Sequence, residues 1–410
     1  MDFESRLKEL AGGVAEKVVD LVALAISEGL RRGASDIHLE PYEGAVELRY
    51  RLDGVLHPAI RVPTKHAQNI VGRVKVLANL LTYRTDVPQE GRIDRDEVGA
   101  TSDLRVSTFP TVRGEKAVIR IFDPETENVG LDRLGYPAPL RDELKRQLQM
   151  PKGMILLTGP AGSGKTTTIY AGLRFILDQS GGAKNIVTVE DPVERMLRGV
   201  TQTQVHPATG LTFGRCLRSM MRQDPEVIVV GEIRDRETAG IAVEAGLTGH
   251  LVISTIHSGT AAGVFTRLLE MEIEPHLLNS AVNFVVAQRL IRKLCAKCRR
   301  PIADERDLMG LTASLTGIAC APVGCEACYG TGYAGRTVIV EALMPTDAIR
   351  RVVLERAATE KIAEVARAEG MTDLVERAMQ AAKDGVTSPA ELLRVMGPGW
   401  EIGRKTKDEG

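Results

Sequence analysis

Residues 159–166 read G-P-A-G-S-G-K-T, a glycine-rich loop that ends in lysine and threonine. Glycines let backbone N–H groups curl around phosphate oxygens, the lysine can reach the β- and γ-phosphates, and the threonine hydroxyl can bind Mg²⁺. An apolar run precedes the loop and a helical pattern starts near Lys165, a context that makes the match specific. The segment predicts a nucleotide site formed by Gly159, Pro160, Ala161, Gly162, Ser163, Gly164, Lys165, Thr166 and Thr167.

Two acidic segments could serve a bound nucleotide, and each follows a short apolar run. Val227–Val230 leads into Glu232, and a carboxylate there points to the phosphate edge of a parallel sheet. The simpler interpretation of Glu232 is an acid that starts a helix. The second segment, V-E-D-P-V-E, contains Glu190, Asp191 and Glu194. One of these acids could orient or activate the attacking water, although acids in loops are usually just solvated.

Two histidines bracket the apolar run Leu251–Ser254. His257 leaves the predicted strand at the ligand end of the sheet, where a sensor of the γ-phosphate would sit. His250 lies at the opposite end, so we expect the two histidines to differ in role. A structural role is the simpler alternative for either one.

Arginines recur at three- and four-residue spacing in the segment 212–222, at positions 215, 218 and 222. This spacing places Arg215, Arg218 and Arg222 on one face of a helix. Such a face is usually solvated. The functional alternatives are a subunit interface or an arginine that reaches a neighbour's nucleotide.

Two C-x-x-C pairs predict a zinc site with four thiolate ligands in a tetrahedron: Cys295, Cys298, Cys325 and Cys328. Four thiols indicate a closed structural site without an open coordination position. A redox-active pair is the rival interpretation. Cys320 could be an alternative ligand or merely buried, and Cys216 is expected in a core.

The elements that must position these residues are indicated by hydrophobic periodicity. Short runs rich in Ile, Val and Leu alternate with helical patterns, and they lack the polar alternation of a half-exposed strand. They are typical of a parallel sheet buried on both faces. The runs are Met154–Leu157, Ile186–Val189, Val227–Val230 and Leu251–Ser254.

The N-terminal part is predicted to be a small α+β domain. Residues 2–30 carry an apolar stripe, which predicts a helix that packs on its own domain or docks a partner. A two-residue period follows, and Asp53-Gly54 predicts a hairpin turn. Residues 64–81 show a helical pattern, and strand-like runs lie near 91–95, 102–109 and 115–122.

The predicted organisation is therefore α/β, with several parts in a fixed order. They are an N-terminal helix (1–33), an α+β domain (34–124), a linker (125–139), a nucleotide-binding core (140–290), a tetracysteine element (291–336), a C-terminal helical region (337–397) and a disordered tail (398–410).

Composition excludes several classes of protein. The chain has 410 residues, a formal net charge of −1 and 43% hydrophobic residues, which excludes a collagen-like or wholly disordered chain. Six cysteines are too few for a disulfide scaffold. Aromatic residues make up 4%, which argues against a protein that stacks single-stranded nucleic acid. We see no signal peptide or membrane-spanning stretch and expect a cytoplasmic protein.

Together these segments resemble the cytoplasmic ATPases of bacterial type II secretion and type IV pilus assembly, over residues 30 to 396. The order and density of the motifs make the resemblance far more specific than the glycine-rich loop alone. The motifs are A-S-D-I-H-L-E-P (34–41), G-P-A-G-S-G-K-T-T-T (159–168), T-V-E-D-P-V-E (188–194), R-Q-D-P-E-V-I-V-V-G-E-I-R-D (222–235), T-G-H-L-V-I-S-T-I-H (248–257), A-Q-R-L-I-R-K-L-C-A-K-C (287–298) and G-C-E-A-C-Y-G-T-G-Y-A-G-R (324–336).

The resemblance implies a role for each matching residue. Lys165 and Thr166 fall in the phosphate loop, Glu194 is the water activator, and Glu232 is the acid on the magnesium side. His250 and His257 match the histidine box. Further arginines match positions that reach the nucleotide phosphates across the domain boundary: Arg92 and Arg105, with Arg113 and Arg120 as less certain members.

The resemblance also implies a RecA-like motor core with a PAS-like N-terminal domain. It implies a homohexamer that uses ATP, Mg²⁺ and structural Zn²⁺, and that works at the cytoplasmic face of the inner membrane. The implied partners are a membrane platform protein and a cytoplasmic adaptor domain, with no nucleic acid and with membrane contact only through partners. Family members of the extension branch usually carry a further N-terminal domain that binds the membrane-anchoring partner. The alternatives here are a truncated system or an atypical one with a different adaptor.

Three other functions compete with an assembly motor. A pilus-retraction motor has the same chemistry, but such motors generally lack the tetracysteine element. A RecA-like nucleic-acid motor with a zinc ribbon could use the basic stretch Arg289–Arg300. A non-catalytic protein that only binds ATP would not need Lys165, Glu194 and Glu232 together.

Overall fold

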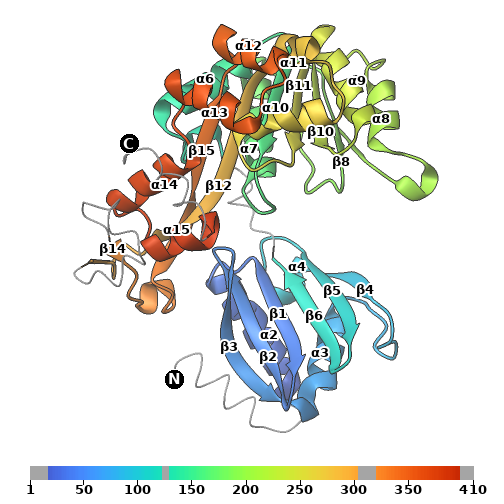
Figure 1. Cartoon of the computed structure of the whole chain (residues 1–410). Helices are drawn as coiled ribbons and strands as arrows, with labels where there is room; N and C mark the ends of the chain where they lie inside the picture. Colours follow the sequence, from blue (N-terminus) through green and yellow to red (C-terminus); the bar gives the residue numbers. More distant parts are fainter. Residues whose placement is uncertain (1–16, 122–128, 303–319, 398–410) are drawn as a thin grey trace. The chain divides into compact units, whose positions relative to one another are not determined.

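The computed structural model describes residues 17–121, 129–302 and 320–397. The chain divides into two compact units, Met1–Asn128 and Val129–Gly410 (Figure 1). The predicted α/β class is confirmed, with an antiparallel α+β unit followed by a unit built on a mostly parallel sheet. Among the described residues, no helix is long and apolar enough to cross a membrane.

The first unit is a six-stranded antiparallel sheet with the strand order β3-β2-β1-β6-β5-β4. Its strands are β1 (Asp36–Tyr42), β2 (Ala45–Leu52), β3 (Val55–Pro63), β4 (Gln89–Ile93), β5 (Leu104–Thr111) and β6 (Gly114–Arg120), and its helices are α2 (Val18–Arg31), α3 (Ala67–Leu77) and α4 (Arg95–Val98).

Local sequence explains most of this unit. The hairpin between β2 and β3 turns at Asp53 and Gly54, whose positive φ angles of 48° and 86° match the predicted turn. The apolar stripe of α2 is buried, which confirms the predicted N-terminal helix from Val18 on; residues 1–16 lie outside the described part. The helix expected over 64–81 is shorter, because a 3₁₀ turn takes residues 64–66 and the chain leaves the helix after Leu77.

The second unit contains a seven-stranded sheet with the order β15-β12-β7-β11-β10-β8-β9. All neighbouring strands are parallel except β15, which runs antiparallel to β12. The strands are β7 (Gly153–Thr158), β8 (Ile186–Glu190), β9 (Thr201–Gln204), β10 (Val227–Ile233), β11 (Leu251–Ile256), β12 (Val282–Leu294) and β15 (Tyr333–Leu343). The four predicted apolar runs are confirmed as strands β7, β8, β10 and β11.

Helices cover both faces of this sheet. Along β7, Met154 and Leu156 belong to one apolar core and Ile155 and Leu157 to the other, which explains the unbroken apolar run. The helices are α6 (Ala138–Gln147), α7 (Lys165–Gln179), α8 (Phe213–Met220), α9 (Arg236–Leu247), α10 (Ala261–Glu270) and α11 (Pro275–Ala281).

The C-terminal part contains the helices expected there. They are α12 (Asp347–Leu354), α13 (Thr359–Ala368), α14 (Leu374–Lys383) and α15 (Pro389–Met396), and they follow β15. A small antiparallel pair, β13 (Arg300–Pro301) and β14 (Cys320–Ala321), lies beside the cysteine segment. The predicted tail, 398–410, lies outside the described residues.

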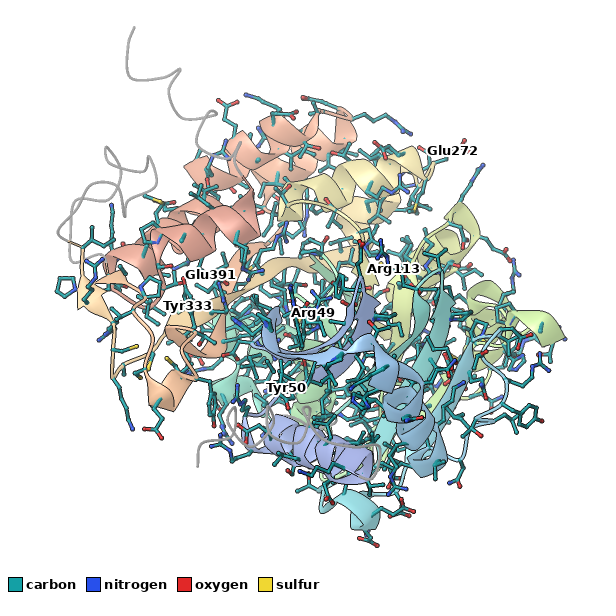
Figure 2. All side chains as sticks on the ribbon, turned by 90° about the horizontal axis from the view of Figure 1, so that it is seen from below. Arg49, Tyr50, Arg113, Glu272, Tyr333 and Glu391 are labelled. Carbon is teal, nitrogen blue, oxygen red and sulfur yellow. The ribbon has the colours of Figure 1, made fainter. Side chains whose placement is uncertain are left out.

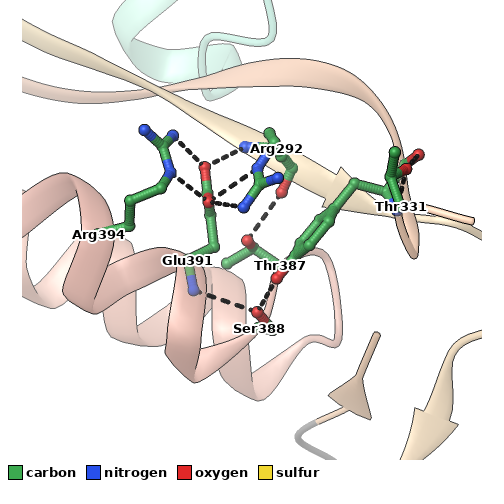
Figure 3. Close-up of polar contacts among 7 residues, drawn as sticks. Arg292, Thr331, Thr387, Ser388, Glu391 and Arg394 are labelled. Carbon is green, nitrogen blue, oxygen red and sulfur yellow. Dashed lines mark hydrogen bonds and ion pairs between the residues drawn. The ribbon is translucent and has the colours of Figure 1, made fainter. Parts of the chain in front are cut away.

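A buried ionic network fastens α15 to the long strand β12 (Figure 3). Glu391 has no exposed side-chain surface and accepts hydrogen bonds from Arg292 at 2.7 and 2.9 Å and from Arg394 at 2.6 and 2.7 Å. The Arg292 guanidinium also lies 3.9 Å from the ring centre of Tyr333, whose hydroxyl is 2.5 Å from the Ser388 hydroxyl. Figure 2 shows Tyr333 and Glu391 together in this C-terminal part of the second unit.

Candidate active site

The glycine-rich loop lies between β7 and α7 and has the backbone that phosphate binding requires. Gly159 and Gly164 adopt φ angles of 143° and 90°, which side-chain-bearing residues rarely adopt. A Cβ at Gly159 would also lie 2.4 Å from the Gln288 carbonyl oxygen. The Lys165 ammonium folds back over the loop and donates to the carbonyls of Gly159 (2.8 Å) and Pro160 (3.0 Å). The loop is therefore closely packed against neighbouring residues of the same chain, and the Lys165 side chain lies over it.

Gln288 of β12 supports this loop and its neighbour Arg289 lies beside it, roles that sequence reasoning did not predict for either residue. The Gln288 amide donates to the Ser163 carbonyl at 2.7 Å, and its oxygen accepts from the hydroxyls of Thr168 and Tyr136. Arg289 donates to the Gly259 carbonyl at 2.8 Å. The sequence signal was available only as part of the A-Q-R-L motif, because the contacts of Gln288 join residues more than a hundred positions apart.

The loop has the cationic environment of an anion site. Burial lowers the pKa of Lys165; the nearby Glu232 carboxylate opposes this shift and the Arg289 guanidinium adds to it. The hydroxyl of Thr166 is exposed and makes no hydrogen bond within the described ranges. Ser163 is 1% exposed, and its hydroxyl has no hydrogen-bond partner there. These donors fit a nucleotide phosphate, and the Thr166 hydroxyl with the Glu232 carboxylate supplies oxygen ligands suited to Mg²⁺.

Glu232 and His257 meet at the carboxyl end of the sheet. The Nε2 atom of His257 lies 3.3 Å from a Glu232 carboxylate oxygen, and Arg234 forms an ion pair with the other oxygen. Glu232 lies within β10, where the ladder to β11 is interrupted between Val230 and Ile233. Glu232 is therefore a strand residue, and this irregularity changes the direction of its side chain. The interpretation of Glu232 as the acid that starts a helix is wrong, because α9 begins at Arg236 with Asp235 as its N-cap.

The acids at the end of β8 differ sharply in their surroundings. Glu190 is 6% exposed, and its carboxylate accepts hydrogen bonds from Tyr170, from Thr188 at 2.6 Å and from Gln202 at 3.0 Å. Glu194 is exposed and makes no side-chain hydrogen bond or ion pair with the described residues. Of the two, only Glu194 has a carboxylate that is not already held by the fold.

His250 lies at the end of the sheet opposite to the phosphate loop, and Arg218 of α8 has a partner within the fold. His250 precedes β11 at the end opposite to His257, and its Nδ1 lies 3.1 Å from the Ala245 carbonyl oxygen. Arg218 forms an ion pair with Glu237 at 2.5 Å. Because α8 ends at Met220, Arg222 lies beyond the helix, and the predicted shared face is wrong for this residue. Cys216 is buried in an apolar core as expected.

Three arginines of the first unit form a row across its sheet. Arg92 pairs with Arg105 in the β4–β5 register, and Arg105 pairs with Arg120 in the β5–β6 register, so their side chains share one face. Asp103 lies 3.3 Å from Arg92, and Asp36 lies 3.3 Å from Arg120. Arg113 is not part of this row: it lies in the hairpin between β5 and β6, 3.5 Å from Glu43.

The four predicted zinc ligands come together in one cluster. The sulfur atoms of Cys295, Cys298, Cys325 and Cys328 all lie within 4.8 Å of one another. Three sulfur–sulfur distances are 3.8 to 3.9 Å, and a tetrahedral zinc site with Zn–S bonds of about 2.3 Å requires edges of about 3.8 Å.

Backbone groups reinforce this cluster. The amides of Cys325 and Gly332 donate to the Cys328 sulfur at 3.2 Å, and that of Gly324 donates to the Cys298 sulfur at 3.3 Å. Such donors stabilise negative charge on sulfur, so the residues fit a thiolate-bound metal. Cys320 is outside the cluster; it is buried with Leu294 and Tyr333 in a small apolar core.

The fold and the phosphate loop define a P-loop ATPase with a parallel central sheet. A family model described as type II/IV secretion system protein matches residues 14–394, and the chain belongs to this family. The resemblance inferred from the sequence motifs is thereby confirmed.

Relatives and solved structures are consistent with this family. The type II secretion system ATPase E of Vibrio cholerae is 42% identical over 381 residues, which cover 92% of this chain and 75% of that protein. The type IV pilus assembly ATPase PilB of Pseudomonas aeruginosa is also 42% identical, over 92% of this chain and 67% of its own. The solved structure of the Yersinia pseudotuberculosis ATPase DotB shares the fold, with a TM-score of 0.67, 21% identity and 92% coverage of each chain.

Proposed function

We propose that this chain is the hexameric motor that couples Mg-ATP hydrolysis to the assembly of a type II secretion pseudopilus or a type IV pilus. The supporting observation is the meeting of Lys165, Glu232 and His257 at the carboxyl edge of the sheet, in a member of the secretion ATPase family. The motor would act at the cytoplasmic face of the inner membrane. Its partners would be a membrane platform protein and an adaptor domain.

The proposed mechanism gives each side chain one task. Lys165 and the loop amides bind the phosphates, with Thr166 and Glu232 as the residues that would hold Mg²⁺. When bound, Mg²⁺ offsets the phosphate charge. Glu194 takes a proton from the attacking water as the water oxygen bonds to the γ-phosphorus. The bond from that phosphorus to the bridging oxygen breaks, which releases ADP and phosphate.

Two further groups complete the proposal. Arg92 and Arg105 of the first unit contact the nucleotide phosphates during the cycle, and His257 responds to the γ-phosphate through Glu232. The four-cysteine cluster holds a structural zinc ion, because all four of its ligands are thiols and no position is left for water.

A nucleic-acid motor is less consistent with the contacts of the basic stretch 289–300. Arg289 donates to the Gly259 carbonyl, Arg292 is bound by Glu391, and Arg299 donates to the Gly385 carbonyl at 2.7 Å. These three cations are engaged within the fold, which leaves Lys293, Lys297 and Arg300 as the other exposed basic residues of the stretch.

The test is the mass of the purified protein in solution, together with its ATP turnover. Turnover is measured alone, with cytoplasmic fragments of candidate platform proteins, and with DNA. We expect a hexamer whose turnover rises with a platform fragment, and no turnover in Lys165→Ala. A monomer stimulated only by DNA would overturn the proposal, and unchanged turnover in Lys165→Ala would remove the phosphate-loop assignment.

A further inference from the structure

The loop that carries Glu194 joins β8 to β9, and the glutamines of β9 hold it on both sides of that residue. β9 reads T-Q-T-Q and is the outermost strand on its side of the sheet. Both of its glutamine side chains form hydrogen bonds with the loop backbone, and Gln202 also donates to Glu190 at the end of β8. Glu194 itself is exposed, so these backbone contacts are what locate it.

Gln204 holds the residue before Glu194. Its side-chain oxygen accepts a hydrogen bond from the backbone N–H of Val193 at 3.1 Å. Only an acceptor is required at this point, because the Gln204 amide donates no hydrogen bond to a described residue of the loop. A carboxylate of the same length could therefore replace the amide.

Gln202 holds the residue after Glu194 and uses all of its polar atoms to do so. Its amide donates to the Arg195 carbonyl and to the Glu190 carboxylate, both at 3.0 Å, and its oxygen accepts from the Leu197 N–H at 2.6 Å. Glu190 in turn accepts from the hydroxyl of Tyr170. Because Tyr170 lies on α7, the helix that begins at Lys165, these contacts tie the loop to the phosphate-binding element.

We infer that Gln202 and Gln204 are positioning residues that fix the Glu194 loop relative to the phosphate loop. This inference rests on the proposed role of Glu194 as the group that takes the proton from water. A proton acceptor must lie within hydrogen-bond reach of its water, and a displacement of about 1 Å can cost about a hundredfold in rate. The two glutamines act on turnover through Glu194 and make no contribution of their own to nucleotide binding.

The experiment compares variants of the full chain by kcat, by KM for ATP, by affinity for a fluorescent ATP analogue, and by unfolding midpoint. In Gln204→Leu the acceptor is lost, and we expect kcat to fall about tenfold while affinity for the analogue stays within about twofold. Gln204→Glu keeps the acceptor and retains most of the turnover. Thr201→Val is the control on the same strand. The Thr201 side chain is exposed and forms no hydrogen bond with the described residues of the loop, so we expect this variant to match the wild type.

Gln202→Met is the second variant and removes three hydrogen bonds at once. We expect its kcat to fall at least as far as that of Gln204→Leu, again without loss of nucleotide affinity. If either variant unfolds at a much lower temperature and loses nucleotide affinity, and Gln204→Glu fails in the same way, the glutamines are merely structural and the inference is wrong.

Glu194→Gln separates this inference from the function on which it rests. Normal turnover in Glu194→Gln would overturn the role of Glu194 and the positioning role together. Lost turnover in Glu194→Gln, with normal turnover in Gln204→Leu and Gln202→Met, would leave the role of Glu194 intact. It would overturn only the positioning role of the two glutamines.

Discussion

At the scale of single residues, His38 is buried as a neutral side chain among charged groups. It lies on β1, and Arg51 lies 3.5 Å from its Nε2 atom. Burial lowers the pKa of His38 to about 4, with the Arg51 and Lys116 charges adding to the shift and Asp36 opposing it. The folded state therefore binds this proton more weakly than the unfolded chain, in which the pKa is near 6.5.

This difference predicts a pH-dependent stability of the first unit. Between pH 6.5 and 4 the unfolded chain binds more protons at this histidine, so the free energy of unfolding should fall as the pH falls. The contribution is about 2 to 3 kcal/mol at its full extent. In His38→Gln this part of the slope should disappear, as measured by denaturant unfolding at pH 7 and pH 4.5. Parallel curves for the two proteins would contradict the shift.

The acids at the end of β8 show how far sequence reasoning reaches at this scale. Glu190 and Glu194 have the same side chain within one short motif, and the sequence predicts that either could act on water. The structure separates them, because Tyr170 of α7 and Gln202 of β9 bind Glu190 and leave Glu194 unbound among the described residues. A single sequence contains no signal for such contacts; only the resemblance to a family favours Glu194.

At the scale of elements, α15 is held to β12 by a buried carboxylate with two cations. Burial raises the pKa of Glu391, but its hydrogen bonds from Arg394 and Arg292 outweigh this effect and lower the pKa below its usual range. The ion pair between Glu391 and Arg292 is a strong constraint once formed, because loss of either partner leaves an unpaired charge in the protein interior.

We predict that Glu391→Gln destabilises the second unit by about 3 kcal/mol, since Arg292 then keeps a buried charge without a counter-ion. The free energy of unfolding in urea is the measurement. Glu360→Gln is the matched control. Glu360 is an exposed residue of α13 that forms no ion pair with the described residues, so the change in stability should be small. Equal effects of the two substitutions would show that the network does not hold α15.

The cysteine cluster gives a prediction about metal content. The wild-type protein, purified without chelator, should contain about one zinc ion per chain, and Cys325→Ser should release it. We expect lower stability of the surrounding segment with little direct effect on the chemistry at Lys165. Elemental analysis and limited proteolysis measure these two outcomes. A metal-free wild-type protein would exclude the zinc site.

Sequence patterns predict the elements better than their connections. Short apolar runs predict four strands of the central sheet, because burial on both faces requires apolar side chains at successive positions. They do not predict that β12 is 13 residues long and continues past the phosphate loop to the cysteines. Its C-terminal half contains arginines that suggest an exposed surface, and Glu391 neutralises one of them from a helix about a hundred residues away.

At the scale of the whole molecule, a substitution in the arginine row of the first unit can test whether that unit takes part in catalysis. We predict that Arg105→Ala lowers ATP turnover by about tenfold or more while leaving the fold of each unit intact, because a phosphate contact from Arg is charge-assisted. Arg113→Ala is the control from the same sheet, since Arg113 lies outside the row. Unchanged turnover in Arg105→Ala would restrict the active site to the second unit.

The continuity of β12 also limits how this family can change in length. Gln288 supports the phosphate loop and Arg292 binds α15, and the ladder to β15 is regular from one to the other. Side chains alternate along a strand, so inserting or deleting one residue between them would turn one of the two away from its partner. Exchanges of side chains at the other positions of this stretch would keep the alternation, whereas a one-residue insertion or deletion would break one of the two contacts.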